Sequence, residues 1–288
     1  MTLQQLVLHE TTRRQLECFL ASPSHSLLLT GPPGIGKSTV AHALATEILG
    51  AEPNSHPYVS LIAPEGLSIS IEAIRQLQKF LLLKTIGERP IRRIAVIEQA
   101  ELLTTEAQNA FLKLLEEPPA DTIVMLTARS PHGLLPTIMS RVQHIAINQP
   151  APAQVQALLE KSLKDETARQ QAYFLSGGLP GLLQALLNEE QEHPLLASVN
   201  LAKELLQKTP FERLAAVDTL SKQKEATLGL VEALKRIAEA GLNSAGAKGE
   251  RTRIVQWHRL RKAALKASEA LKRSANAKLV LDDLLLSL

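Results

Sequence analysis

The chain has 288 residues, of which 45% are hydrophobic, 21% charged and only 3% aromatic. This composition is typical of a globular protein of two or three domains with a core of aliphatic side chains, which favours helix-rich packing. A net charge of +3 is too small to indicate nucleic-acid binding by itself, and the single cysteine, Cys18, excludes an internal disulfide and a cysteine-based zinc site.

Targeting and membrane signals are missing from the sequence. The N-terminus lacks the charged and apolar regions of a signal peptide, and no run reaches about 18 apolar residues. We therefore expect a cytoplasmic protein with no membrane contact. Lys and Arg outnumber Asp and Glu between Lys222 and Lys278. This excess indicates either a solvated helical face or a contact surface for DNA or an acidic partner.

The first 150 residues alternate short apolar runs with helical patterns, which predicts a parallel sheet covered on both faces. The predicted strands are Ser26–Thr30, Tyr58–Ile62, Arg93–Ile97, Thr122–Thr127 and Val142–Ile147. Helices are predicted over Lys37–Leu49 and Ile71–Leu83. A third follows Thr105, which with Gln108 has the spacing of a capping box, and ends at Pro118-Pro119.

The second half of the chain is predicted to be helical throughout. Pro150-Ala151-Pro152 marks one domain boundary and His193-Pro194 a second, while residues 176–181 read as a turn. Asn243–Gly249 is the one obvious loop of the last domain. We therefore expect three domains, at residues 1–150, 151–192 and 193–288.

Residues 31–38 read Gly-Pro-Pro-Gly-Ile-Gly-Lys-Ser, a complete phosphate-binding loop between a predicted strand and a predicted helix. Backbone N–H groups and the positive helix end would face the phosphates, Lys37 would reach the β- and γ-phosphates, and Ser38 would hold Mg²⁺. The expected cofactors are ATP or ADP with Mg²⁺. The other interpretation is a loop that folds correctly but binds no nucleotide. The predicted nucleotide-binding residues are Gly31, Pro32, Pro33, Gly34, Ile35, Gly36, Lys37, Ser38 and Thr39.

The acidic element that should complete an ATPase site is altered. Glu98-Gln99 follows the strand Arg93–Ile97, where P-loop ATPases usually carry Asp-Glu. Glu98 keeps a carboxylate that could contact Mg²⁺, but Gln99 cannot accept a proton. The loss of a general base costs about 10²–10⁴ in rate, and Glu101, expected on a turn past the strand, is a poor substitute. The sequence predicts nucleotide binding with little or no hydrolysis.

The run from Ala100 to Val142, with its Leu-Leu-Glu-Glu-Pro-Pro and Ser140-Arg141 motifs, closely resembles the AAA+ clamp-loader subunits of bacterial DNA polymerase III. This resemblance is strong over most of residues 20–150, is weaker through the lid, and returns at residues 276–281, which resemble the collar end of such subunits. It implies an α/β fold in which an AAA+ P-loop domain with a five-stranded parallel sheet precedes a small helical lid and an all-helical collar for oligomerisation. Relatives often carry a four-cysteine zinc module, which is missing here, so no zinc is expected.

Within that family, the chain is most similar to delta-prime subunits, which hydrolyse ATP poorly or not at all. Glu98-Gln99 replaces the motor subunits' Asp-Glu, the lid motif Gly178–Gly181 lacks their sensor arginine, and no tau-like extension follows the collar. The implied function is to help load a sliding clamp on primed DNA during replication. The implied partners are gamma/tau and delta subunits, the clamp and primer-template DNA, with no membrane.

The resemblance also implies roles for individual residues. Arg141 would be an arginine finger in the nucleotide site of a neighbouring subunit, where such a group is worth about 10³–10⁵ in rate. Thr127 would be a sensor, although the usual Ala-Thr order is reversed here in Thr127-Ala128. Arg75 and Lys79 would contact DNA phosphates. Arg141 could instead be a surface arginine paired with a carboxylate, and Arg75 and Lys79 a solvated helix flank.

Two other functions remain open from the sequence. The chain could be a gamma/tau-like motor in which Glu98 and Gln99 support slow hydrolysis, so whether it is an enzyme is left undecided. A small-molecule phosphotransferase is disfavoured, because it explains neither the Ser-Arg motif nor the helical C-terminal third.

Overall fold

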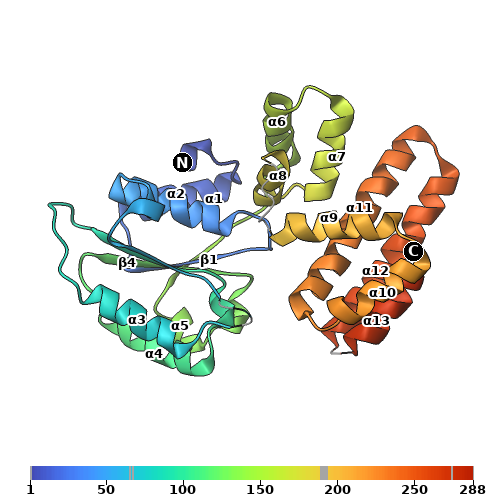
Figure 1. Ribbon diagram of the computed structural model, residues 1–288. Helices are drawn as coiled ribbons and strands as arrows, with labels where there is room; N and C mark the ends of the chain where they lie inside the picture. Colours follow the sequence, from blue (N-terminus) through green and yellow to red (C-terminus); the bar gives the residue numbers. More distant parts are fainter. Residues whose placement is uncertain (1, 65, 67, 189–193, 274, 288) are drawn as a thin grey trace. The chain divides into compact units, whose positions relative to one another are not determined.

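The computed structural model describes residues 2–64, 66, 68–188, 194–273 and 275–287. The chain divides into two compact units, Met1–Ala151 and Pro152–Leu288. The first unit contains helices and strands, and the described residues of the second contain helices alone (Figure 1). Each unit has its own buried core.

The first unit is built on a five-stranded parallel sheet, as predicted. Its strand order is β2-β3-β4-β1-β5. All four pairings between neighbouring strands are parallel, so the carboxyl ends of all five strands lie at one edge. The strands are β1 Ser26–Thr30, β2 Val59–Ile62, β3 Arg93–Ile97, β4 Thr122–Ala128 and β5 Gln143–Ala146. Their bounds differ from the predicted ones by at most one residue at either end.

Helices cover both faces of this sheet (Figure 1). One face carries α1 Glu10–Ala21 and α2 Lys37–Leu49. The other carries α3 Ile71–Leu81, α4 Thr105–Glu116 and α5 Pro136–Met139. Short 3₁₀ turns complete the unit: η1 Leu3–Gln5, η2 Pro53–Ser55, η3 Ala100–Leu102 and η4 Pro131–Gly133.

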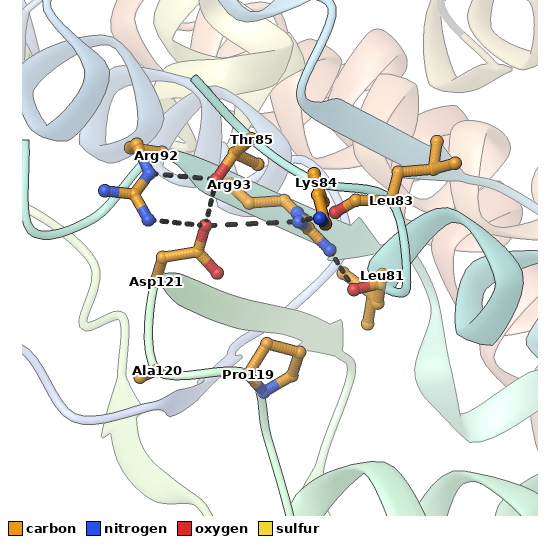
Figure 2. A pocket seen from close by; sticks show the side chains of 9 residues that line it. All are labelled: Leu81, Leu83, Lys84, Thr85, Arg92, Arg93, Pro119, Ala120 and Asp121. Atoms are coloured by element: carbon orange, nitrogen blue, oxygen red, sulfur yellow. Dashed lines mark hydrogen bonds and ion pairs between the residues drawn. The ribbon is translucent and has the colours of Figure 1, made fainter. Parts of the chain in front are cut away.

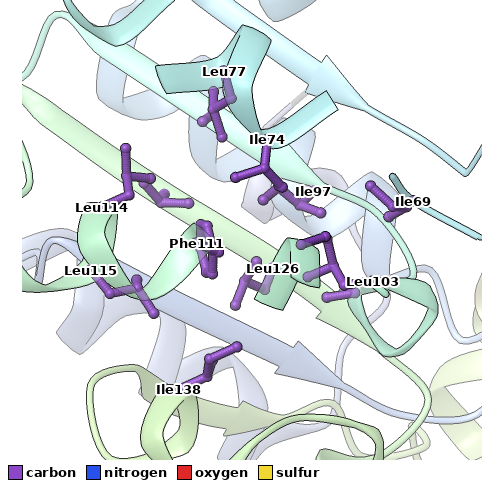
Figure 3. Packing of buried hydrophobic residues seen from close by; sticks show 14 of the residues in the cluster. Ile69, Ile74, Leu77, Ile97, Leu103, Phe111, Leu114, Leu115, Leu126 and Ile138 are labelled. Carbon is purple, nitrogen blue, oxygen red and sulfur yellow. The ribbon is translucent and has the colours of Figure 1, made fainter. Parts of the chain in front are cut away.

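The core beneath α3, α4 and α5 follows the two-residue period of the strands. Leu28, Ile97 and Leu126 come from three neighbouring strands and pack in one cluster with Phe111 of α4 (Figure 3). Phe111 is fully buried, and burial of one such side chain contributes about 1.5–3 kcal/mol. This packing fixes the strand ends from which the polar loops of the sheet edge begin.

The helix predicted over Ile71–Leu83 ends at Leu81. The buried guanidinium of Arg93 donates hydrogen bonds to the carbonyl oxygens of Phe80, Leu81 and Leu83. These bonds satisfy the last carbonyls of the helix from the side, so the chain can leave the helical path there. The sequence pattern could not show this, because the donor lies on the next strand.

The capping box predicted from Thr105 and Gln108 does not form. The N-cap of α4 is Thr104, one residue earlier, whose hydroxyl accepts a hydrogen bond from Ala107 N at 3.2 Å. Gln108 is buried and bonds to neighbouring loops instead. The prediction was wrong because Thr104 and Thr105 are adjacent, and the hydroxyl of either residue could cap the helix.

The second unit is helical, and its described residues contain no strand. Helices α6, α7 and α8 share a small apolar cluster around Val155, Leu159 and Leu183, and α9–α13 share a larger one around Leu234. The predicted turn at residues 176–181 joins α7 to α8. The helices are α6 Pro152–Ser162, α7 Glu166–Ser176, α8 Pro180–Leu187, α9 Pro194–Gln207, α10 Pro210–Leu220, α11 Lys224–Lys248, α12 Arg251–Lys272 and α13 Ala277–Leu286.

A division of this unit into a lid and a collar stays a prediction. The predicted end of the lid at residue 192, and His193 of the second boundary motif, lie outside the described residues. Among the described helices, none combines the length and apolar character needed to cross a bilayer.

The loop predicted at Asn243–Gly249 is wrong, because α11 continues to Lys248. Only Gly249, with a φ of 68°, and Glu250 separate α11 from α12. Upstream in the same helix, Gly241 packs against Trp257 of α12, and a Cβ at Gly241 would lie 2.3 Å from the indole ring. Gly241 therefore serves close helix packing in α11, whereas Gly246, inside the predicted loop, lies in the helix with open space around it.

Candidate nucleotide site

The phosphate-binding loop lies where it was predicted, between the carboxyl end of β1 and the start of α2. Gly34 and Gly36 have φ values of 84° and 96°, a region that favours glycine. Gly31 N donates a hydrogen bond to Ala128 O at 3.3 Å, which joins the loop to the end of β4. All nine predicted nucleotide-binding residues, Gly31 to Thr39, therefore lie in one continuous turn that leads into a helix N-terminus.

Lys37 is half-buried at this turn. Its Nζ donates hydrogen bonds to Gly31 O at 2.8 Å and Pro32 O at 3.1 Å. Burial lowers the pKa of Lys37 to about 8, with Glu101 and Glu98 raising it and Arg129 lowering it. These three charged groups therefore lie close enough to Lys37 to influence its protonation.

The ends of β3 and β4 meet beside the loop. Glu98 follows β3, and Gln99 has a φ of 50°, the only positive φ among the described non-glycine residues. Thr127 is buried, and its hydroxyl accepts a hydrogen bond from Gln99 N at 3.1 Å. The predicted sensor thus holds the backbone of the residue that replaces the general base. Whether Thr127 senses nucleotide stays a prediction.

Glu101 lies on η3, past the strand end as expected, and faces Arg129. Its Oε1 accepts a hydrogen bond from Arg129 N at 3.1 Å and lies 3.6 Å from Arg129 Nε. Its Oε2 is buried and has no hydrogen-bond partner. The sequence interpretation missed Arg129. Its position in the sequence could have indicated a place in the site, because Arg129 directly follows β4, and the last residue of β4 bonds to the phosphate loop.

Gln108 connects this edge to the segment that leads to Arg141. Its Nε2 donates to Leu103 O and Gly133 O, and its Oε1 accepts from Leu135 N at 2.8 Å. Leu103 follows η3, whereas Leu135 precedes α5. One buried side chain therefore joins the turn that carries Glu101 to the helix that ends just before Ser140-Arg141.

Arg141 lies at the opposite edge of the sheet from the phosphate loop. Its carbonyl oxygen accepts a hydrogen bond from Ser26 Oγ at 2.7 Å, at the start of β1. The five residue-to-residue steps from Ser26 to Gly31 span roughly 16 Å at about 3.3 Å per step. The guanidinium is partly exposed and pairs with Glu116 at 2.9 Å. The backbone of Arg141 is thus held far from the phosphate loop of its own chain.

The predicted DNA-contacting residues lie on the exposed face of α3. Arg75 and Lys79 are both exposed, and Arg75 pairs with Glu72 at a long 3.6 Å. In the second unit, the basic excess falls largely on α12, where Arg251, Arg259 and Lys262 are exposed. Exposure is compatible with either contact or solvation, so both expectations stay predictions.

A surface hollow exists at the amino-terminal edge of the sheet, away from the phosphate loop (Figure 2). Asp121 bonds there with Thr85, Arg92 and Arg93. Burial raises the pKa of Asp121, but the hydrogen bond from Thr85 and the charges of Arg93 and Arg92 outweigh it, so the pKa lies below its usual value. The charged groups of this hollow therefore contact one another, and these contacts hold the loop after α3 in place.

The residues of the loop fit a nucleotide phosphate. Glycines with positive φ, free helix N-terminal N–H groups and a cationic Lys37 supply the donors that such a group requires. Ser38 and Glu98 are half-buried oxygen donors and are the residues that would hold Mg²⁺, which prefers oxygen ligands. The bound metal would neutralise phosphate charge. The sheet order, the loop and the helical second unit give the chain the fold class of AAA+ P-loop proteins.

Solved structures agree on the fold. A DNA polymerase III gamma subunit-related protein from Thermotoga maritima aligns with a TM-score of 0.54 and 20% identity, over 96% of this chain and 97% of that one. RuvB from the same organism aligns with a TM-score of 0.52 and 16% identity, over 86% of this chain and 84% of that one. The predicted fold class is confirmed.

Sequence comparison shows which proteins of this fold the chain is similar to. Residues 15–151 match the family model described as "DNA polymerase III, delta subunit". The DNA polymerase III subunit delta' of Pseudomonas aeruginosa is 31% identical over 65% of this chain and 62% of its own length. The delta' subunit of Escherichia coli is 30% identical over 56% of this chain and 54% of its own length. A DNA polymerase III gamma/tau subunit from Mycobacterium bovis is 29% identical over 50% of this chain and 28% of its own length.

These matches confirm the predicted resemblance: the chain is similar to clamp-loader subunits of DNA polymerase III, and to the delta-prime type in particular. The chain spans a little over half the length of the delta-prime relatives that it matches.

Proposed function

We propose that this protein is a delta-prime-like subunit of a DNA polymerase III clamp loader. It would bind nucleotide with weak or no hydrolysis and supply Arg141 to the nucleotide site of a neighbouring subunit. Its partners would be gamma/tau and delta subunits, a sliding clamp and primer-template DNA. The observation that carries the proposal is the position of Arg141. Its backbone is roughly 16 Å from its own phosphate loop, so a role in phosphoryl transfer requires a second subunit.

Weak hydrolysis follows from the end of β3. Gln99 cannot accept a proton, and Thr127 holds its backbone. Glu101 is engaged with Arg129 and is therefore a poor general base. The alternative function, a gamma/tau-like motor, is supported by the intact phosphate loop and by Glu98. Steady-state ATPase activity of the isolated chain separates the two, because rapid turnover favours the motor. If only the base is missing, Gln99→Glu should raise a weak rate.

The test of Arg141 uses the loader assembled with motor subunits. Arg141→Ala should lower the rate at the one site that receives this residue by about 10³–10⁵, so total ATPase activity should lose that site's share. Glu116→Gln is the matched control, because it removes the intrachain partner of Arg141 and keeps the guanidinium. Size-exclusion chromatography should show intact assembly for both variants. An unchanged ATPase rate in Arg141→Ala would remove the proposed role.

A further inference from the structure

Three charged side chains gather at the phosphate end of the nucleotide site. Lys37 Nζ is bound to Gly31 O, Gly31 N is bound to Ala128 O, and Arg129 is the next residue along the chain. Glu101 holds Arg129 through its backbone N–H and lies 3.6 Å from Arg129 Nε. One carboxylate and two cations therefore lie where a γ-phosphate would add further negative charge.

Glu101 and Arg129 differ in their freedom to move. The side chain of Glu101 is only 15% exposed, whereas that of Arg129 is 59% exposed. Gly133 packs against Glu101 so closely that a Cβ on the glycine would lie 2.6 Å from Glu101 Cβ. The carboxylate is thus fixed from two sides, with one oxygen buried and unpaired, while the guanidinium can turn toward a ligand.

We propose that Glu101 and Arg129 determine the nucleotide preference of this site: Glu101 disfavours a triphosphate relative to a diphosphate, and Arg129 is the cation that a γ-phosphate recruits. This inference rests on the nucleotide binding proposed above. In the free protein, Arg129 neutralises Glu101. A γ-phosphate would compete for Arg129 and leave a partly buried carboxylate without its cation beside another anion.

The energetic argument concerns like charges at short range. Two like charges close together in a partly buried site repel more strongly than in water, and partial exposure reduces this repulsion. A diphosphate ends before the γ position and avoids most of the repulsion. Removal of the Glu101 charge should therefore improve triphosphate binding by about tenfold or more and change diphosphate binding much less.

The experiment measures the affinities of the full chain for Mg²⁺–ADP and for the non-hydrolysable Mg²⁺–AMPPNP by isothermal titration calorimetry. Glu101→Gln keeps the size of the side chain and an oxygen that can accept from Arg129 N. It should shift the preference toward AMPPNP by about tenfold. Arg129→Gln should shift the preference in the opposite direction. Glu117→Gln, which removes an exposed charge just after α4, is the charge-matched control and should change neither affinity.

The outcomes separate this inference from the proposed function. If both nucleotides bind and Glu101→Gln leaves their ratio unchanged, the preference role is overturned and nucleotide binding stands. If neither nucleotide binds to the wild type or to Glu101→Gln, the inference and the proposed nucleotide binding both fail. Thermal unfolding without nucleotide should show similar stability for the three variants, so that a lost affinity is not misread as lost folding.

Discussion

At the scale of single residues, the ammonium of Lys37 links nucleotide affinity to pH. Burial lowers its pKa to about 8 in the free protein. A bound phosphate favours the charged form and raises that pKa again. Above pH 8 the free protein must therefore take up a proton in order to bind. The dissociation constant for nucleotide should rise about tenfold for each pH unit above 8. Below about pH 7, the protonation of Lys37 should no longer change it with pH.

Calorimetric titrations with ADP between pH 7 and pH 9.5 check this expectation. Lys37→Arg is the control, since guanidinium stays protonated throughout this range, and its affinity should not show the same decline. A wild-type profile as flat as that of Lys37→Arg would mean that Lys37 does not lose its proton in this range.

How much of the site the sequence could predict also depends on the residue. The phosphate loop was predictable because its chemistry is local: glycines, a lysine and a serine at fixed spacing. Glu101, Arg129 and Gly133 come together only when the carboxyl ends of β3 and β4 meet. Their sequence separation hides their contact. The positive φ of Gln99 had no signal either, because glutamine gives no warning of that conformation.

At the scale of elements, the contact between α11 and α12 is set by one glycine. Gly241→Val should destabilise the second unit by about 1–3 kcal/mol, because its side chain would overlap the ring of Trp257. Trp257 is the only tryptophan of the chain, so urea unfolding followed by its fluorescence reports on this contact directly.

The same helix supplies the control for this prediction. Gly246 also lies in α11, and a Cβ there would meet nothing within 4 Å. Gly246→Ala should stabilise the unit by up to about 1 kcal/mol, since alanine is the better helix former. If Gly241→Val and Gly246→Ala shifted stability equally, helix propensity rather than packing would govern both positions.

Element boundaries were predictable to the extent that local chemistry sets them. The strands of the first unit were found within a residue or so, because most of them are short apolar runs bounded by polar residues. The end of α3 was not, since Arg93 from the following strand terminates it. The loop predicted at Asn243–Gly249 was wrong for a different reason: Gly246 lies inside α11 with open space around it, and a glycine that is tolerated in a helix looks the same in sequence as one that permits a turn.

At the scale of the whole molecule, a net charge of +3 is too small to attract DNA strongly, so any DNA contact depends on where the basic side chains lie. Under the proposed function, Arg75→Ala combined with Lys79→Ala should weaken binding of the assembled loader to primed DNA at low salt. The slope of log affinity against log salt concentration should fall by about 2, one for each lost phosphate contact. Fluorescence anisotropy at several salt concentrations measures both quantities.

The matched control removes the same two kinds of charge elsewhere. Arg259 and Lys262 are exposed on α12, and their double alanine variant lowers the net charge equally. If both double variants weakened DNA binding to the same degree, either overall charge or a contact through the basic residues of α12 would be responsible, and the face of α3 would lose its special role.

The opposite placement of Arg141 and the phosphate loop restricts the symmetry of any complex built through them. Donor and acceptor surfaces lie at different rims of one sheet, so a two-fold dimer would not be the natural product of this contact. Such a contact is heterologous and propagates head to tail, ending either in ring closure or in an open arc. In an open arc, one terminal subunit donates its arginine yet receives none. A chain whose own hydrolytic residues are altered loses least in that terminal position.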